Sequence, residues 1–221
     1  MKRTLALAVA CALVLEGCGE SDAPGEARKK TVLEYASMKD IRNINPHLYL
    51  GEMAAQAMVF EPLVFNTPEG VKPALAERWE ISGDGRTYTF HLRQGLKWHL
   101  TDAVTERMGK NWDPDITAHD FVFALQRAVS PQTACPLYPA LSGIAGAQQV
   151  YTKQKSASAL QVKATDDYTL VITLRTPDAG FFSTLSGAAA MPCNKEFFTA
   201  TKGRYGLGTE YSPVSYTHLR A

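Results

Sequence analysis

The chain has 221 residues, a formal net charge of +1 at pH 7, 45% hydrophobic residues and 20% charged residues. This composition is ordinary for a globular protein. The near-zero net charge gives no electrostatic reason to expect a nucleic-acid partner, and we find no apolar stretch of the ~20 residues that a membrane-spanning helix needs.

The first residues of the chain change character at a cysteine. A basic start is followed by an unbroken apolar run over residues 5–15, which has the length of a signal-peptide core. The run ends in Leu-Glu-Gly-Cys at Cys18, which resembles a bacterial lipobox, where the cysteine is lipidated. Glu16 departs from the small or aliphatic residue that is usual there.

We therefore expect residues 1–17 to be a signal peptide and Cys18 to carry a lipid. Residues 18–30 are expected to form a flexible tether, because their small, charged and turn-forming residues cannot bury enough apolar surface to fold. The alternative is an ordinary signal peptide followed by a chance cysteine.

Two of the four cysteines, Cys135 and Cys193, lie beyond this leader and are 58 positions apart. In an oxidising, exported setting they can form a disulfide, and closing such a loop stabilises a fold by roughly 4 kcal/mol in the chain-entropy model. Two separate buried thiols are the alternative. The sequence leaves both open.

Strand and helix patterns begin after the tether. Residues 31–37 indicate a strand, and residues 51–60 have helix-forming composition with apolar residues at helical spacing. The segments 79–82 and 87–93 flank a Gly-Asp-Gly turn and predict a hairpin. The polar, irregular stretch 99–115 is interpreted as a loop.

Residues 117–129 predict a helix, in which Thr117 is the N-cap and Asp120 completes a capping box. Ser-Pro ends it. A second hairpin is predicted over 161–174, with its turn at an Asp-Asp pair. Short helices are expected to begin near Asp178 and near Asn194.

No motif for catalysis is present: the sequence has no nucleophile elbow, no phosphate loop and no dinucleotide fingerprint. Of the histidines, no pair has the spacing of a helical metal site, so neither a metal nor another cofactor is expected. Trp79, Trp98 and Trp112 are interpreted either as ligand-stacking residues or, more commonly for this residue type, as buried anchors.

Four stretches together resemble one family. They are PALAERWEISGDGRTYTFHLRQGLKW, TAHDFVFALQRAVSPQTACP, VKATDDYTLVITLRTPDAGFF and MPCNKEFF, in this order. The family is that of the extracellular solute-binding proteins of ABC importers, which includes oligopeptide- and dipeptide-binding lipoproteins. The resemblance covers about residues 31–211. It implies a binding protein and not an enzyme.

The resemblance implies a mixed α/β (α+β) fold of the two-lobed, type II periplasmic-binding-protein class, with a domain inserted into the first lobe. Residues 31–60 would begin lobe I, residues 61–192 would form the inserted mixed α/β domain, and residues 193–211 would return to lobe I. The second lobe would be missing. The last residues, 212–221, do not resemble the family and are expected to be a non-native tail.

The resemblance also implies a ligand and partners. Lobe I contacts to an oligopeptide would fall at Leu50, Gly51 and Glu52, and at Leu137 or Tyr138, for which loop packing is the alternative role. The partners would be the permease subunits of an ABC importer and, through the lipid, the membrane, with the protein itself a monomer outside the cytoplasm. Relatives that bind nickel complexes or oligosaccharides leave other ligands open, and an exported lipoprotein enzyme such as a hydrolase is the rival class.

Overall fold

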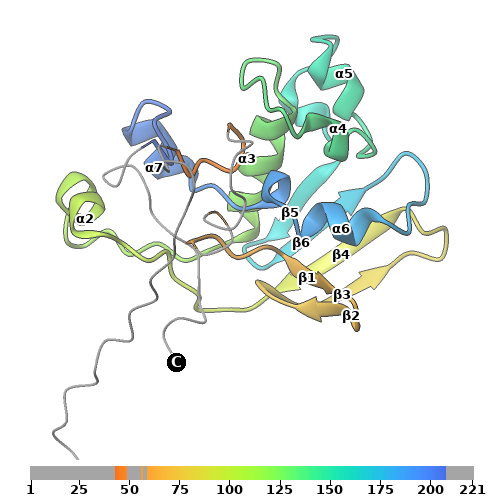
Figure 1. The fold of residues 1–221 in the computed structure, drawn as a ribbon, viewed down its shortest axis with the longest axis horizontal. Helices are drawn as coiled ribbons and strands as arrows, with labels where there is room; N and C mark the ends of the chain where they lie inside the picture. Colours follow the sequence, from red (N-terminus) through yellow and green to blue (C-terminus); the bar gives the residue numbers. More distant parts are fainter. Residues whose placement is uncertain (1–42, 49–55, 57–58, 208–221) are drawn as a thin grey trace, which may run out of the picture. The chain divides into compact units, whose positions relative to one another are not determined.

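Two antiparallel sheets form the strand part of the protein, as seen in a computed structural model that describes residues 43–48, 56 and 59–207. All of these residues belong to one compact unit, Met38–Ala221. The smaller sheet pairs β1 (Val64–Thr67) with β2 (Gly70–Pro73), and the larger has the order β3-β4-β6-β5 (Figure 1). Its strands are β3 (Ala76–Ile81), β4 (Thr87–Leu92), β5 (Val162–Asp166) and β6 (Thr169–Thr173).

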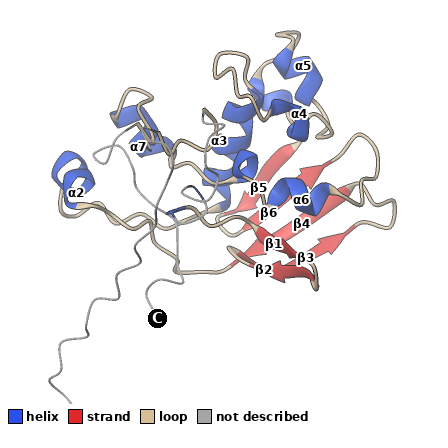
Figure 2. Cartoon of the chain, in the orientation of Figure 1, coloured by secondary structure: helices blue, strands red, loops and turns tan. Residues whose placement is uncertain are grey.

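Helices are interleaved with these strands (Figure 2). In chain order they are α2 (Asp102–Met108), α3 (Ala118–Val129), α4 (Tyr138–Leu141), α5 (Ala147–Tyr151), η1 (Ala157–Ala159), α6 (Phe181–Leu185), η2 (Ala188–Ala190) and α7 (Lys195–Ala200). Both predicted hairpins, the 117–129 helix and the two short helices are confirmed. The expected strand at 31–37 and most of the expected helix at 51–60 lie outside the described residues.

The core lies between the large sheet and α3, which packs against β5 and β6. Along β4 the side chains of Tyr88, Phe90 and Leu92 are buried while the residues between them are partly exposed, as the period of a strand requires. The facing side of α3 is apolar, with Phe121 and Leu125 fully buried. This packing fixes the position of α3, which carries the polar residues Asp120 and Arg127.

The expectation of a loop over 99–115 was wrong in part, because α2 lies within it. Thr101 caps this helix by accepting a hydrogen bond from the Val104 N–H at 3.3 Å, with Asp102 in the first turn and Arg107 in the last. Only Val104 is buried. Without an apolar stripe there was no periodicity to reveal the helix, although the cap itself was readable.

The small hairpin of β1 and β2 was also missed. Its strands are short and exposed, and a Pro-Glu-Gly turn joins them, with Gly70 at φ 117°. Of the four residues of β1, Val64 alone is fully buried. The turn was a signal that could have located the hairpin.

Candidate functional site

Leu137 and Tyr138, the predicted ligand contacts within the described residues, lie at the start of α4. Leu137 occupies the N-cap position and packs against the core. Tyr138 is partly buried, and its ring stacks on that of Tyr151 with centroids 3.8 Å apart and planes inclined by 7°. Burial, with Tyr151 beside it, raises the pKa of the Tyr138 phenol. Both residues therefore have packing partners within the chain.

The other predicted site residues have different outcomes. Leu50, Gly51, Glu52 and the lipidation candidate Cys18 lie outside the described residues. Cys135 and Cys193 are both buried and are free thiols, so the disulfide is not formed in this structure and the alternative of separate thiols describes it. Burial raises the pKa of each thiol, which makes both poor nucleophiles.

The three tryptophans all have partners inside the protein. Trp98 is 2% exposed and its indole N–H donates to Asp120 at 3.2 Å. The indole N–H of Trp112 donates to Glu196 at 2.8 Å, and Trp79 packs against the ring of Phe182 at 5.5 Å. These contacts are those of structural anchors, although Trp79 and Trp112 keep some exposed surface.

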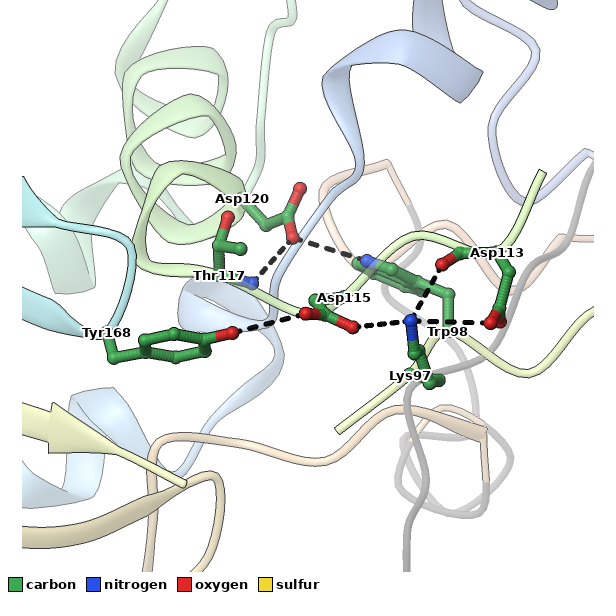
Figure 3. A network of polar contacts seen from close by, with 7 residues as sticks. All are labelled: Lys97, Trp98, Asp113, Asp115, Thr117, Asp120 and Tyr168. Carbon is green, nitrogen blue, oxygen red and sulfur yellow. Dashed lines mark hydrogen bonds and ion pairs between the residues drawn. The ribbon is translucent and has the colours of Figure 1, made fainter. Parts of the chain in front are cut away.

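A polar network joins the stretch before α3 to the turn between β5 and β6 (Figure 3). The Lys97 ammonium bonds the Asp113 carbonyl at 2.9 Å and lies 2.7 Å from an Asp115 carboxylate oxygen. The other Asp115 oxygen accepts from the Tyr168 hydroxyl at 3.1 Å. Lys97, and secondarily Tyr168, lower the pKa of Asp115. These groups are solvent-accessible, so the network fixes a loop with little energy per ion pair.

Asp120 is the buried member of the same region, 6% exposed in the first turn of α3. One carboxylate oxygen accepts both the Trp98 indole N–H and, at 3.0 Å, the backbone N–H of Thr117. Figure 3 shows both donors directed at this oxygen. Burial raises the pKa of Asp120 to about 7, although the two N–H donors act in the opposite direction.

A second buried polar cluster lies two helical turns along α3. The Arg127 guanidinium donates to His47 Nδ1 at 2.7 Å and to the Asn45 side-chain oxygen at 3.3 Å. It also lies 4.8 Å above the ring of Phe198, a cation–π contact. His47 is fully buried, and burial together with Arg127 lowers its pKa to about 3. The imidazole is therefore neutral at physiological pH.

This cluster brings together two stretches that are far apart in sequence. The Ile44 N–H donates to the Gly206 carbonyl at 2.9 Å, and the Asn45 side-chain amide donates to the Tyr205 carbonyl at 2.7 Å. A side chain at Gly206, whose φ is +75°, would place a Cβ 2.5 Å from the Asn45 nitrogen. The residue must be glycine for the two stretches to approach this closely.

Two open cavities lie on the described part of the chain. One of about 520 Å³ lies between the end of α3 and the loop after α5, with Lys153 and Lys155 in its wall. Another, of about 410 Å³, is lined by His91, Asp166 and Tyr168 among others. Within the described ranges no three His, Cys, Asp or Glu side chains are grouped so as to hold a metal ion, and no helix is long and apolar enough to cross a membrane.

Comparison with known proteins shows which family the chain belongs to. The sequence profile described as bacterial extracellular solute-binding proteins, family 5 Middle, matches residues 70–214. This match spans more than half of the chain, and the protein belongs to this family of extracellular solute-binding proteins.

Individual relatives refine the comparison. The chain is 39% identical over 166 residues to the probable deoxycholate-binding periplasmic protein YgiS of Escherichia coli K12, covering 73% of this chain and 29% of that protein. It is 38% identical over 141 residues to the periplasmic oligopeptide-binding protein OppA of Haemophilus influenzae, covering 62% of this chain and 24% of the relative.

Solved structures lead to the same class. The crystal structure of Haemophilus influenzae OppA in complex with RPPGFSPFR superposes with a TM-score of 0.64 at 32% sequence identity, covering 75% of this chain and 31% of that one. The expected type II periplasmic-binding-protein fold is thereby confirmed. The chain spans about a quarter to a third of the length of the proteins it matches.

Proposed function

We propose that this chain is the first part of the substrate-binding component of an ABC importer and captures oligopeptides outside the cytoplasmic membrane. The observation that carries the proposal is the joint agreement of the family match with the superposition on a peptide-bound OppA. In this proposal the chain works with permease subunits, as a monomer, and with a second lobe that completes the binding cleft.

The domain division predicted from the sequence belongs to the same proposal. Residues 31–60 begin lobe I, 61–192 form the inserted domain and 193–211 return to lobe I. The hydrogen bonds between Ile44, Asn45 and the stretch 205–206 support the return, because they bring the two proposed lobe I segments side by side.

Ligand contacts are proposed at Tyr138 and Leu137 and at the undescribed residues Leu50, Gly51 and Glu52. Tyr138 already stacks on Tyr151, so a ligand would meet the edge or the outer face of a two-ring platform rather than a lone mobile side chain. Aromatic pairs of this kind contribute area at low entropic cost.

The binding test uses a two-lobed protein that contains this chain, together with the chain alone. Titration calorimetry with a mixed pool of tri- to pentapeptides is expected to give micromolar binding for the two-lobed protein and millimolar or weaker binding for the chain alone. Affinity depends on both sides of a closing cleft. The chain alone lacks the contacts that the second lobe would make to the peptide, and losing a buried charge-assisted contact of this kind costs several kcal/mol. Equal micromolar binding by the chain alone would show that the second lobe is not needed and that the proposal assigns the site to the wrong lobe.

A matched pair of variants tests the contact residue. Tyr138→Ala is expected to weaken peptide binding by about tenfold, the ~1.4 kcal/mol of one aromatic contact. Tyr151→Ala, which removes the supporting ring from the same stack, is the control. If Tyr138→Ala and Tyr151→Ala lose the same stability, and Tyr138→Ala keeps the affinity of the parent, Tyr138 is a packing residue and not a ligand contact.

Deoxycholate is the second candidate ligand, because the relative at 39% identity is a probable deoxycholate-binding protein. The same titration with deoxycholate in place of peptide distinguishes the two. Saturable binding of deoxycholate, with none of peptide, would replace the oligopeptide proposal while leaving the transport role intact.

Lipid anchoring at Cys18 is a separate proposal, motivated by the basic start, the apolar run over 5–15 and the tether that follows. Labelled palmitate is expected to enter the expressed protein and to be absent from Cys18→Ser. Cys11→Ser is the control and should keep the label. Persistent labelling of Cys18→Ser would show that the cysteine is there by chance.

A further inference from the structure

A small hollow between α2 and the end of α7 is lined mainly by positive charge. The cavity has a volume of about 170 Å³, and the described residues that line it are Arg107, Ala200, Thr201, Lys202 and Arg204. Three of them are cationic and none is acidic. Figure 1 shows the two helices next to one another, although they are far apart in the sequence. We call this cavity the α2–α7 hollow.

Contacts beside the hollow hold its two walls together. The ring of Trp112, shortly after α2, stacks on that of Phe197 in α7 with centroids 5.9 Å apart. The Trp112 indole N–H donates to Glu196 at 2.8 Å, so this carboxylate has a partner away from the hollow. Both elements are therefore anchored to one another, and the three cations meet at the hollow as part of this packing.

The backbone at the end of α7 leaves recognition to the side chains. The N–H groups of residues 201–204 all donate to carbonyls of α7 and of the turn that follows it, at distances between 2.9 and 3.1 Å. The Thr201 hydroxyl donates to the Phe197 carbonyl at 2.8 Å. Among the described residues, the donors that remain at the hollow are thus the ammonium group of Lys202 and the two guanidinium groups.

The three charges are accessible to a ligand. Lys202 is exposed, and its ammonium has no ion pair with an acid among the described residues. Arg107 and Arg204 are exposed as well, and each has a further interaction within the chain. A guanidinium carries five N–H donors, so a partner elsewhere does not exhaust it. Like charges at one cavity repel one another, and a multivalent anion between them relieves this repulsion.

Cations near helix ends also have a simpler role, because the C-terminal end of a helix carries partial negative charge. This role accounts for Arg107 in the last turn of α2 and for Lys202 just beyond α7, each taken singly. It does not require the charges to line one cavity. Lys202 also has φ +52°, a conformation that is uncommon for a residue with a side chain.

We propose that the α2–α7 hollow binds a phosphate group through the charges of Arg107, Lys202 and Arg204. Arginine donors match the geometry of phosphate oxygens, and lysine adds a compact charge. A phosphate monoester carries nearly two negative charges at neutral pH, so three cations favour it over a carboxylate. The hollow is smaller than the roughly 300–1,000 Å³ of sites for drug-sized ligands, which fits a single group. Free phosphate and a lipid headgroup present the same chemistry.

A phosphate titration of the full chain tests the site without peptide, so its outcome is independent of the proposed transport function. Inorganic phosphate replaces chloride at constant ionic strength and neutral pH, and ¹H–¹⁵N spectra follow the backbone amides of residues 200–204 and of Arg107. These signals should shift along a saturable curve in the millimolar range, because exposed charge contacts are screened. Shifts that do not saturate in this range, or that chloride produces equally, would overturn the proposal.

Charge variants assign the binding to the hollow. Lys202→Gln and Arg107→Gln should each weaken phosphate binding by about fivefold, the upper range for an exposed charge contact, whereas Lys202→Arg should retain it. Lys195→Gln makes the same charge change at the other end of α7, outside the hollow, and is the matched control. If Lys202→Gln binds phosphate as tightly as Lys195→Gln does, the cations serve the helix ends alone and the proposal fails.

Vesicles distinguish the two sources of the phosphate group. The full chain is floated with phosphatidylcholine vesicles that contain or lack phosphatidic acid. The apolar run over residues 5–15 would bind both kinds, so the difference between them is the measurement. A gain with phosphatidic acid that is lost in Lys202→Gln identifies a lipid headgroup as the source, and saturable phosphate binding without this gain identifies free phosphate. Neither result in the parent would overturn the proposal.

Discussion

Two glycines with similar positive φ angles provide a sharp test of the packing around α5. Gly146 has φ +87° and Gly95 has φ +73°, a region in which an L side chain is strained. A Cβ on Gly146 would lie 2.2 Å from the Ala159 carbonyl oxygen and 3.1 Å from Leu160 Cα, whereas a Cβ on Gly95 would meet nothing within 4 Å.

The expected costs follow from these distances. Gly95→Ala should lower the free energy of unfolding by about 1–2 kcal/mol, the strain of a left-handed residue. Gly146→Ala adds a clash with backbone atoms, which cannot rotate away as a side chain does. Overpacking of this kind costs a further ~1–3 kcal/mol, so the total is about 2–5 kcal/mol.

The assay is chemical unfolding of the full chain, followed by tryptophan fluorescence, for the parent and both variants. The midpoint should shift further for Gly146→Ala than for Gly95→Ala, with the same slope against denaturant concentration. Equal shifts for the two glycines would mean that η1 does not approach Gly146 as closely as the structure places it, and the reasoning would fail.

Three further outcomes are expected. Thr117→Ala should cost about 1 kcal/mol in chemical unfolding, the typical value of a capping residue, and an unchanged midpoint would contradict the role of the capping box. Iodoacetamide should label Cys135 and Cys193 only once the chain is unfolded, and no reductant should be needed, because both thiols are buried and free. A disulfide-linked peptide pair in the mass spectrum would contradict this. Tyr151→Ala should cost about 1 kcal/mol by unstacking Tyr138, a loss absent in Tyr151→Phe.

Local elements of this protein were predictable because their signals are local. The alternation of apolar residues along 87–93 and the Gly-Asp-Gly turn before it define a hairpin without reference to any other part of the chain. The helix over 117–129 combines a cap, an apolar face and a terminating proline. In contrast, α2 has a cap but only one buried residue, Val104, so no apolar periodicity marks it in the sequence.

The candidate site was less predictable, because its partners are far apart in sequence. Thr117 and Asp120 were paired from their spacing, but the second donor to Asp120, Trp98, lies 22 positions earlier. Arg127 and His47 are 80 positions apart, and neither was identified as part of a cluster. An arginine in the last turn of an amphipathic helix and a histidine after a proline were the signals available.

The amino-acid sequence by itself determined the two hairpins of the large sheet, the helix over 117–129, the two short helices near Asp178 and Asn194 and the family resemblance, since these depend on periodicity, turns and ordered motifs. Tertiary structure alone decided which side chains are buried together. It placed Cys135 and Cys193 as separate free thiols, gave each tryptophan an internal partner and enclosed the Asp120 carboxyl. Desolvation is a property of everything packed around a group, and for that reason the pKa of Asp120, raised to about 7, arises only in the folded chain.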